Sequence, residues 1–283
     1  MPYPQTIAIP NNPSLKGMAR VDRGLIYSKQ HGQKLTLLRP WFVQGEPLIK
    51  RPLIVFLQGS AWTSPDSDYE IPQLGRYAQE GYVVATLSHR DSGLGHAFPA
   101  YLEDTKTAIR FLKANADVLG IDAQRVAMFG TSSGGNAALL VGLTADDSRY
   151  KTQEFNEYSD AVNTVIACFA PSSIPAMVQQ QYDQMAQHPA FVNLVGNQAP
   201  QDVARGMSPI YEIKQGASYP PILLAHGDAD EVVPYSQSVD MYHALLDAGY
   251  RAQLIRVIGA PHEDSFWSGR LHGLLSDYLK ETL

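Results

Sequence analysis

Short apolar runs alternate with amphipathic stretches along most of this chain, and this alternation restricts the possible fold more than any other feature. The runs are rich in branched residues and mostly apolar throughout, which is typical of strands buried on both faces of a sheet. They cover residues 53–56, 82–87, 126–129, 162–169, 222–225 and 254–258. The clearest amphipathic stretch spans residues 101–116, where Leu102, Ile109 and Leu112 share one helical face. The pattern predicts a doubly wound, mainly parallel α/β sheet flanked by helices.

Two further segments complete the predicted architecture. Residues 24–28 and 34–38 flank a His-Gly-Gln turn, which predicts an antiparallel hairpin at the edge of the sheet. Residues from about 173 to 218 break the alternation, with many Gln, Ala and Met, and they predict a small cap or lid over the carboxyl ends of the strands. No repeat, low-complexity tract or linker composition interrupts the chain, so residues 1–283 are expected to form a single domain.

Charge and hydropathy exclude several classes of partner. Lys and Arg total 22 against 28 Asp and Glu, a formal net charge of −6, and this balance lacks the basic field that nucleic acids and anionic membranes require. The apolar runs are far shorter than the roughly 20 residues of a membrane-spanning helix. Without a basic patch followed by an apolar core near Met1, no secretory signal is expected and a cytoplasmic location is the default. The oligomeric state stays open, a homo-oligomer included.

The single cysteine of the chain, Cys168, lies inside the apolar run 162–169. A thiol in such a setting is typical of a small buried hydrophobic residue. One cysteine also excludes an intramolecular disulfide.

A Gly-x-Ser-x-Gly sequence joins one apolar run to a predicted helix. Residues 130–134 read Gly-Thr-Ser-Ser-Gly and directly follow the run 126–129. This context is typical of a nucleophile elbow, a turn so tight that the residues two before and two after the serine must lack bulk. Gly130 and Gly134 hold those positions around Ser132, whereas Ser133 lacks them. Ser132 is therefore the candidate nucleophile, and an ordinary loop with a helix N-cap is the alternative.

A serine hydroxyl attacks slowly unless a base removes its proton and a carboxylate orients that base. Residues 226–234 and 259–264 directly follow apolar runs, so both loops are expected at the strand edge where Ser132 lies. His262 is the candidate base because of its place after the last strand. Asp230 is preferred over Asp228 as the acid because the residues after it, 232–234, can anchor its loop.

The histidines and acids near these loops allow two other interpretations, a metal site or purely local contacts. His226, Asp228 and Asp230 together imitate a metal site, but ligands so close within one turn seldom all point inward, and no metal site is expected. His226 closes a strand and is expected to form local hydrogen bonds. His89 and His96 follow the run 82–87, where they are expected either to touch substrate or to face water.

The loop after the run 53–57 supplies candidate donors for an oxyanion. Residues 58–62 read Gln-Gly-Ser-Ala-Trp, and small residues allow the backbone to approach a ligand closely. The candidate oxyanion donors are the backbone N–H groups of Ser133, Ser60 and Ala61, and a mere tight turn is the alternative. Aromatic and aliphatic residues near this edge are candidates for an apolar acyl pocket or for ordinary core packing. These residues are Trp62, Phe98, Ile174, Phe191 and Trp267.

Taken together, these segments resemble the α/β-hydrolase superfamily over nearly the whole chain, and in particular its microbial esterase/lipase branch that includes acetyl-xylan and feruloyl esterases. In that branch the oxyanion loop usually reads His-Gly-Gly-Gly before Trp or Phe, whereas residues 58–62 carry Gln in place of His and side chains in place of two glycines. Residues 98–104 and the turn at 120–122 also resemble the branch. The string 226–234 resembles its acid loop, which implies Asp230 as the triad acid.

These residues and the resemblance favour a metal-independent serine esterase that acts on a small-molecule ester without any cofactor. The bulk at Ser60, Ala61 and Trp62 narrows the site, which favours short or aromatic acyl groups. A peptidase of the prolyl-oligopeptidase type is the first alternative, although the amino-terminal segment is too short for a propeller and no obvious acidic pair could hold a peptide amino group. A non-catalytic binding protein on the same fold is the second.

Overall fold

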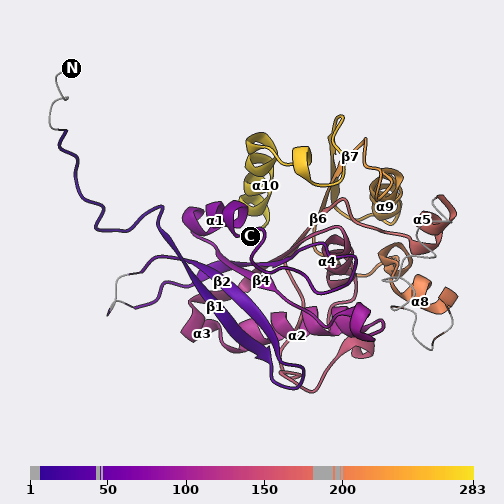
Figure 1. Cartoon of the computed structure of the whole chain (residues 1–283), viewed down its shortest axis with the longest axis horizontal. Helices are drawn as coiled ribbons and strands as arrows, with labels where there is room; N and C mark the ends of the chain where they lie inside the picture. Colours follow the sequence, from indigo (N-terminus) through magenta and orange to yellow (C-terminus); the bar gives the residue numbers. More distant parts are fainter. Residues whose placement is uncertain (1–6, 43–44, 46, 181–193, 195–197, 199) are drawn as a thin grey trace.

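The computed structural model of the chain describes residues 7–42, 45, 47–180, 194, 198 and 200–283. Its centre is an eight-stranded sheet with the order β1-β2-β4-β3-β5-β6-β7-β8 (Figure 1). The pairs β1–β2 and β2–β4 are antiparallel, and all pairs from β4–β3 to β7–β8 are parallel. The strands are β1 (Ala19–Ser28), β2 (Gln33–Pro40), β3 (Arg51–Leu57), β4 (Val83–Leu87), β5 (Ile121–Thr131), β6 (Thr164–Cys168), β7 (Ile222–Gly227) and β8 (Ala252–Val257). The predicted mainly parallel sheet with an amino-terminal hairpin is confirmed.

Helices cover both faces of this sheet. They are α1 (Ile71–Glu80), α2 (Ala100–Ala114), α3 (Ala116–Leu119), α4 (Ser133–Leu143), α5 (Ile174–Gln180), α8 (Pro200–Gly206), α9 (Ser236–Asp247) and α10 (Gly269–Thr282). The helices α1 and α10 pack on one face, and α2, α4 and α9 pack on the other (Figure 1). Each face therefore has its own apolar core, and the central strands are buried on both sides. This burial explains why their sequences are apolar runs without alternation.

The boundaries differ from the sequence prediction at the start of β5. The strand begins at Ile121, although the apolar run begins only at Val126. Between these residues its pairing with β3 shifts register, so that Pro52 pairs with Asp122 and Leu53 with Val126. Because the residues in this irregular part are polar, the apolar pattern did not predict the first part of the strand. The expected turn at 120–122 is confined to Gly120, whose φ is 69°.

The predicted cap at about 173–218 contains α5, α8 and a short 3-10 turn, Pro209–Glu212. The N–H of Ile174 donates to Ser208 Oγ at 2.8 Å, which ties the two ends of this segment together. Ile174 and Met207 are fully buried in the same core as α4. Residues 181–193, 195–197 and 199 of the cap lie outside the described residues, and its role as a lid stays a prediction. Among the described residues, each helix is too short or too polar to cross a bilayer.

Candidate active site

Ser132 lies at a sharp turn between β5 and α4. Its backbone has φ 51° and ψ −121°, a conformation that side-chain-bearing residues rarely adopt. A Cβ on Gly130 would lie 2.1 Å from Gly134 O, and a Cβ on Gly134 would lie 2.0 Å from Leu57 O. Steric contact with neighbouring backbone atoms, and not only backbone flexibility, therefore requires glycine at both positions. The Ser132 N–H donates to Cys168 O at 2.9 Å, which ties the turn to the end of β6.

The structure brings Ser132, His262 and Asp230 together. His262 Nε2 lies 3.1 Å from Ser132 Oγ, and His262 Nδ1 lies 2.7 Å from Asp230 Oδ2. The side chain of Asp230 has no exposed surface, and that of His262 is 15% exposed. Asp230 follows β7 and His262 follows β8, so these loops do converge at the carboxyl edge of the sheet. The geometry corresponds to a nucleophile, a base and an orienting acid.

Asp230 is an anion held by surrounding donors. Its Oδ1 accepts the N–H groups of Val232 and Val233, both at 2.8 Å. Burial raises the pKa of Asp230, but the contacts of its carboxylate with His226 and His262 and the Val233 N–H outweigh burial and hold this pKa well below its usual range. Asp228, the competing acid, instead contacts Arg256 and accepts the N–H of Gly259 at 2.6 Å. That carboxylate serves the turn after β7.

Aromatic rings fix the position of His262. The ring of Phe169 packs edge-on against that of His262, with centroids 4.6 Å apart. Phe266 and Trp267 in turn pack on Phe169, at 4.9 and 6.2 Å. Sequence reasoning missed Phe169, whose position at the end of an apolar run is the only signal that it reaches the catalytic edge. Trp267, a predicted pocket residue, belongs to this aromatic cluster beside His262.

The loop after β3 presents its backbone to Ser132. A Cβ on Gly59 would lie 2.6 Å from that of Ser132, so only glycine fits there. Gly59 N–H donates to Thr131 Oγ1 at 2.9 Å, and Gln58 Oε1 accepts the N–H of Asp66 at 2.8 Å. The Gln58 side chain, which stands where the resembling branch has His, thus braces its own loop.

One of the three predicted oxyanion donors is already engaged. The N–H of Ser60 donates to Ser133 Oγ at 2.9 Å and is therefore not free for a substrate in this structure. Sequence reasoning could not foresee this bond, because it joins two turns that only the fold brings together. Among the described residues, no hydrogen bond takes the N–H of Ala61, and the N–H of Ser133 opens the first turn of α4. These two donors remain.

Three of the other predicted pocket residues, Trp62, Phe98 and Ile174, are buried in this structure. Trp62 and Phe98 are 5% and 8% exposed, and both rings pack near Tyr101, at 6.4 and 5.9 Å. Ile174 has no exposed surface. Phe191 lies outside the described residues. The predicted pocket thus stays a prediction for Trp62, Phe98 and Trp267, whereas Ile174 is a core residue in this structure.

Sequence reasoning did not identify two buried polar groups near the site, Asn136 and Glu70. Asn136, on α4, accepts a hydrogen bond from Tyr101 Oη at 2.8 Å and donates to Pro171 O and Met207 O at 2.9 and 2.8 Å. A lone polar residue inside an apolar helix was its signal. Glu70, which precedes α1, is 5% exposed, and burial followed by the charge of Glu263 raises its pKa to about 7.

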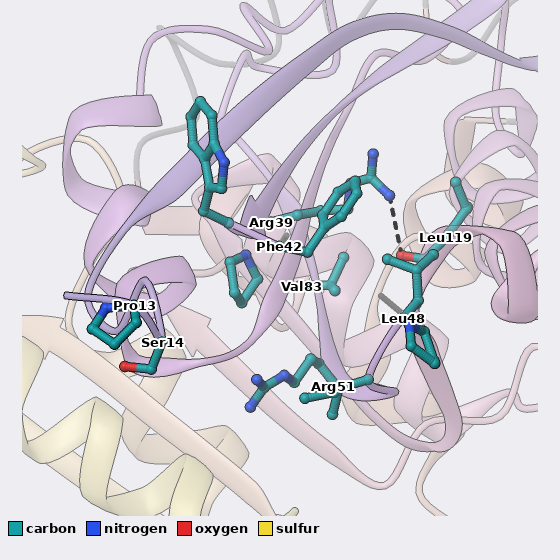
Figure 2. A pocket seen from close by; sticks show the side chains of 13 residues that line it. Pro13, Ser14, Arg39, Phe42, Leu48, Arg51, Val83 and Leu119 are labelled. Carbon is teal, nitrogen blue, oxygen red and sulfur yellow. Dashed lines mark hydrogen bonds between the residues drawn. The ribbon is translucent and has the colours of Figure 1, made fainter. Parts of the chain in front are cut away.

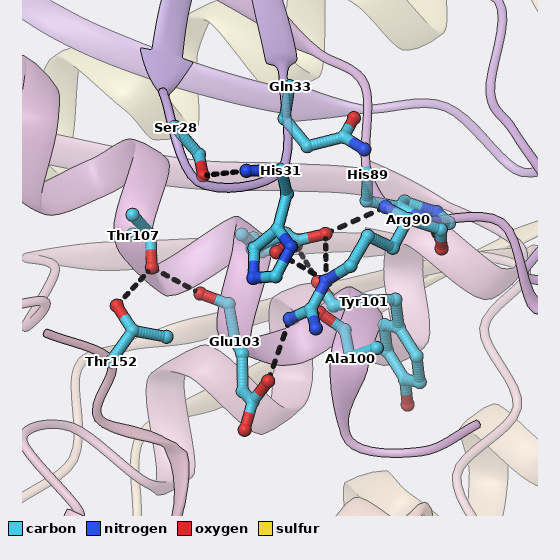
Figure 3. A network of polar contacts seen from close by, with 12 residues as sticks. Ser28, His31, Gln33, His89, Arg90, Ala100, Tyr101, Glu103, Thr107 and Thr152 are labelled. Carbon is cyan, nitrogen blue, oxygen red and sulfur yellow. Dashed lines mark hydrogen bonds and ion pairs between the residues drawn. The ribbon is translucent and has the colours of Figure 1, made fainter. Parts of the chain in front are cut away.

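An ionic network holds the loop after β4 against α2 (Figure 3). Arg90 Nε lies 3.0 Å from both carboxylate oxygens of Asp104, and its Nη2 lies 2.7 Å from Glu103 Oε2. His89, before it, is 2% exposed and packs against Tyr101, so it does not face water. Burial lowers the pKa of His89. The network fixes one side of the loop that carries Phe98.

A separate pocket of ≈ 450 Å³ lies at the opposite edge of the sheet (Figure 2). Arg51 and Val83 line it at the first residues of β3 and β4, together with Gly120 before β5. These positions are the amino ends of parallel strands, whereas Ser132 follows the carboxyl end of β5. The pocket is therefore not part of the candidate active site. Within the described residues, no group of three or more His, Cys, Asp or Glu could hold a metal ion.

Sequence comparisons identify one family and several relatives. The BD-FAE family model matches residues 44–245. Esterase LipC of Mycobacterium tuberculosis is 31% identical over 76% of this chain and 53% of its own length. A probable isoprenylcysteine alpha-carbonyl methylesterase of Oryza sativa is 25% identical over 90% of this chain and 61% of its own length. The chain therefore spans between half and two thirds of these curated relatives.

Solved structures share the fold. A truncated carbohydrate esterase from gut microbiota superposes with a TM-score of 0.81 at 24% identity, covering 96% of this chain and 98% of that one. An esterase of Thermogutta terrifontis, solved with butyrate bound, has a TM-score of 0.74 at 25% identity and covers 95% of both chains. The same esterase was also solved phosphoramylated by tabun, with a TM-score of 0.73 over 95% of this chain and 96% of that one at 25% identity.

Proposed function

The chain belongs to the BD-FAE family, and from this membership and the geometry around Ser132 we propose that it is a serine carboxylesterase. The observation that carries the proposal is the pair of contacts at His262, 3.1 Å to Ser132 Oγ and 2.7 Å to Asp230 Oδ2. A hydroxyl, an imidazole and a buried carboxylate in this order are the parts that acyl transfer needs. The named esterases among its relatives support the same reaction class.

The proposed reaction follows from these contacts. Asp230 accepts Nδ1–H of His262, which leaves Nε2 with a lone pair facing Ser132 Oγ. Nε2 removes the hydroxyl proton as Oγ attacks the ester carbonyl, and the N–H groups of Ser133 and Ala61 stabilise the oxyanion. His262 then gives the proton to the leaving alcohol as its C–O bond breaks. Water hydrolyses the acyl-enzyme by the same steps and releases the acid.

For the substrate, we propose an ester with a short or aromatic acyl group. The side chains of Ser60 and Ala61 occupy space that glycines would leave open, and Trp62 and Phe98 stand close by with positions fixed by Tyr101. A relative solved with butyrate supports a short acyl group. Nitrophenyl acetate, butyrate and hydroxycinnamate should be hydrolysed faster than long-chain esters, and the opposite order would contradict this preference.

The test of the reaction itself is Ser132→Ala. We expect hydrolysis of an aryl acetate to fall by at least about 10³-fold, and labelling by a fluorophosphonate probe to disappear, while the melting temperature stays close to that of the parent. Ser276→Ala removes a hydroxyl on α10, which contacts Glu80 at 3.2 Å, and is the matched control that should keep full activity. Activity of Ser132→Ala equal to the parent would refute the proposal.

A further inference from the structure

His226, the penultimate residue of β7, touches the same carboxylate as the candidate base. Its side chain has no exposed surface. Its Nε2 lies 3.2 Å from Asp230 Oδ2 and 2.9 Å from Val233 O, and its Nδ1 lies 2.7 Å from Ser238 Oγ. The sequence predicted only local hydrogen bonds for this histidine. Its contacts are local, with residues 230, 233 and 238, and one of them is Asp230, the carboxylate that also contacts His262.

The partners of His226 determine which ring nitrogen carries the proton of the neutral ring. A carboxylate oxygen and a carbonyl oxygen both accept and neither donates, so the proton belongs on Nε2. Nδ1 is then an acceptor, and its partner Ser238 must donate its hydroxyl proton. Ser238, on α9, therefore donates to Nδ1 and is compatible with the tautomer whose Nε2–H faces Asp230 and Val233.

Asp230 Oδ2 is shared between two imidazoles. His262 Nδ1 approaches it at 2.7 Å and His226 Nε2 at 3.2 Å, while Oδ1 is occupied by the backbone of residues 232 and 233. Both oxygens are thus restrained, and the restraint on the oxygen that faces His262 comes from His226. Without it, rotation of the carboxylate about its last bond would be limited by the two backbone donors and by His262 itself.

We propose that His226 is a positioning residue for the reaction: it holds Oδ2 of Asp230 where Nδ1–H of His262 is received, and Ser238 restrains the His226 ring through its contact with Nδ1. This inference rests on the proposed esterase function. A path of polar contacts then runs from Ser238 through His226, Asp230 and His262 to Ser132, with a 3.2 Å contact between His226 Nε2 and Asp230 Oδ2, and it links α9 to the nucleophile.

The titratable and charged groups next to this path come from three elements. The Tyr235 ring, just before α9, packs edge-on against His226 at 5.7 Å, and Arg256 of β8 lies over the Tyr235 ring at 5.9 Å. Asp228 pairs with Arg256 in the turn after β7. Glu231 and Glu263 directly follow Asp230 and His262 in the chain. None of these is changed in the variants below, so any shift in pH dependence reports on the path itself.

The decisive comparison is His226→Leu against His226→Gln. Leu removes the donor, and Gln returns an N–H close to the position of Nε2. We expect His226→Leu to lower kcat per fluorophosphonate-reactive site by 10- to 100-fold with KM within about twofold of the parent. The acid limb of its kcat/KM profile should differ from that of the parent, because the carboxylate that faces His262 is no longer held in place. His226→Gln should recover most of kcat.

A purely structural role predicts a different result. His226→Leu would then lose melting temperature and reactive sites, but each remaining site would keep the parent's kcat and the parent's acid limb, and this outcome would overturn the proposal. Ser238→Ala should lower kcat by three- to tenfold, whereas the buried-serine control Ser276→Ala should not. Equal kcat in these two variants would remove Ser238 from the path.

One measurement does not depend on esterase activity. The Nδ1–H proton of His262, bonded to Asp230, should give a downfield proton NMR resonance that shifts in His226→Leu and is unchanged in Ser276→Ala. If the parent proves inactive on every ester, the proposed function fails, and this resonance still decides whether His226 controls the contact between Asp230 and His262. A resonance identical in the parent and His226→Leu would refute the inference.

Discussion

A carboxylate without exposed surface is costly unless donors surround it, and Asp230 meets this condition through both oxygens. The donors come from two places: the backbone directly after Asp230, and two imidazoles from β7 and the loop after β8. These donors hold the pKa of Asp230 well below its usual range, although burial alone would raise it.

Replacing this charge tests its role directly. In Asp230→Asn the side-chain oxygen can still accept the N–H groups of Val232 and Val233, so the loop should keep its shape. The amide group facing His262 cannot accept Nδ1–H, and the ring will favour the wrong tautomer. We expect kcat on an aryl acetate to fall by roughly 10³- to 10⁴-fold with an unchanged far-UV circular dichroism spectrum. A loss smaller than tenfold would mean that another group orients His262.

Between elements, a fully buried group of charges outside the site joins α2 to the segment before β6. Asp160 is 1% exposed and pairs with Lys106 Nζ at 2.7 Å and Arg110 Nη1 at 2.9 Å, two cations whose side chains have no exposed surface. Burial lowers the pKa of Lys106, and the charge of Asp160 opposes this shift. Lys106 also donates to Thr144 O, just after α4. Asp160, directly and through Lys106, therefore connects α2, the end of α4 and the segment before β6.

Removing this single charge should destabilise the fold severely. Asp160→Asn leaves two buried cations without the anion that contacts both, and we expect the free energy of unfolding to fall by about 3–5 kcal/mol, measured by urea denaturation. The exposed pair of Asp277 and Lys280 offers the matched comparison, because Asp277→Asn removes an ion pair that water already screens. Similar losses in the two variants would show that the buried charges are not the source of the effect.

At the scale of the whole molecule, the sheet could be predicted because its signal is local. Each central strand is apolar throughout, and each pair of neighbours is parallel, so composition alone indicates burial on both faces. The positions of Ser132, Asp230 and His262 at strand ends follow from the same order of elements. The bond from Ser60 N–H to Ser133 Oγ does not, because it depends on the distance between two turns. The burial of Ile174 depends likewise on how the cap packs against α4.

The environment of Glu70 also depends on segments that only the fold brings together. The fold places this carboxyl, 5% exposed, near Cys168 of β6 and Glu263 of the loop after β8, three segments far apart in the chain. Burial and then the charge of Glu263 raise the pKa of Glu70 from 4.5 to about 7. Between these two values the folded chain binds a proton that the unfolded chain has lost, so stability should decrease as the pH rises through this range. Above about pH 7 Glu70 is ionised in the folded chain, and the loss of stability caused by burying this charge is complete.

Glu70→Gln cannot ionise and should remove this cost. We expect the variant to be more stable than the parent at pH 8, on the order of 1–2 kcal/mol after allowance for screening by water, and the difference to shrink to nearly nothing at pH 4.5. Urea denaturation at both pH values measures it, with the exposed Glu157→Gln as a control that should show no such dependence. A gain of the same size at pH 4.5 and pH 8 would mean that packing of the amide, and not the lost charge, stabilises the variant.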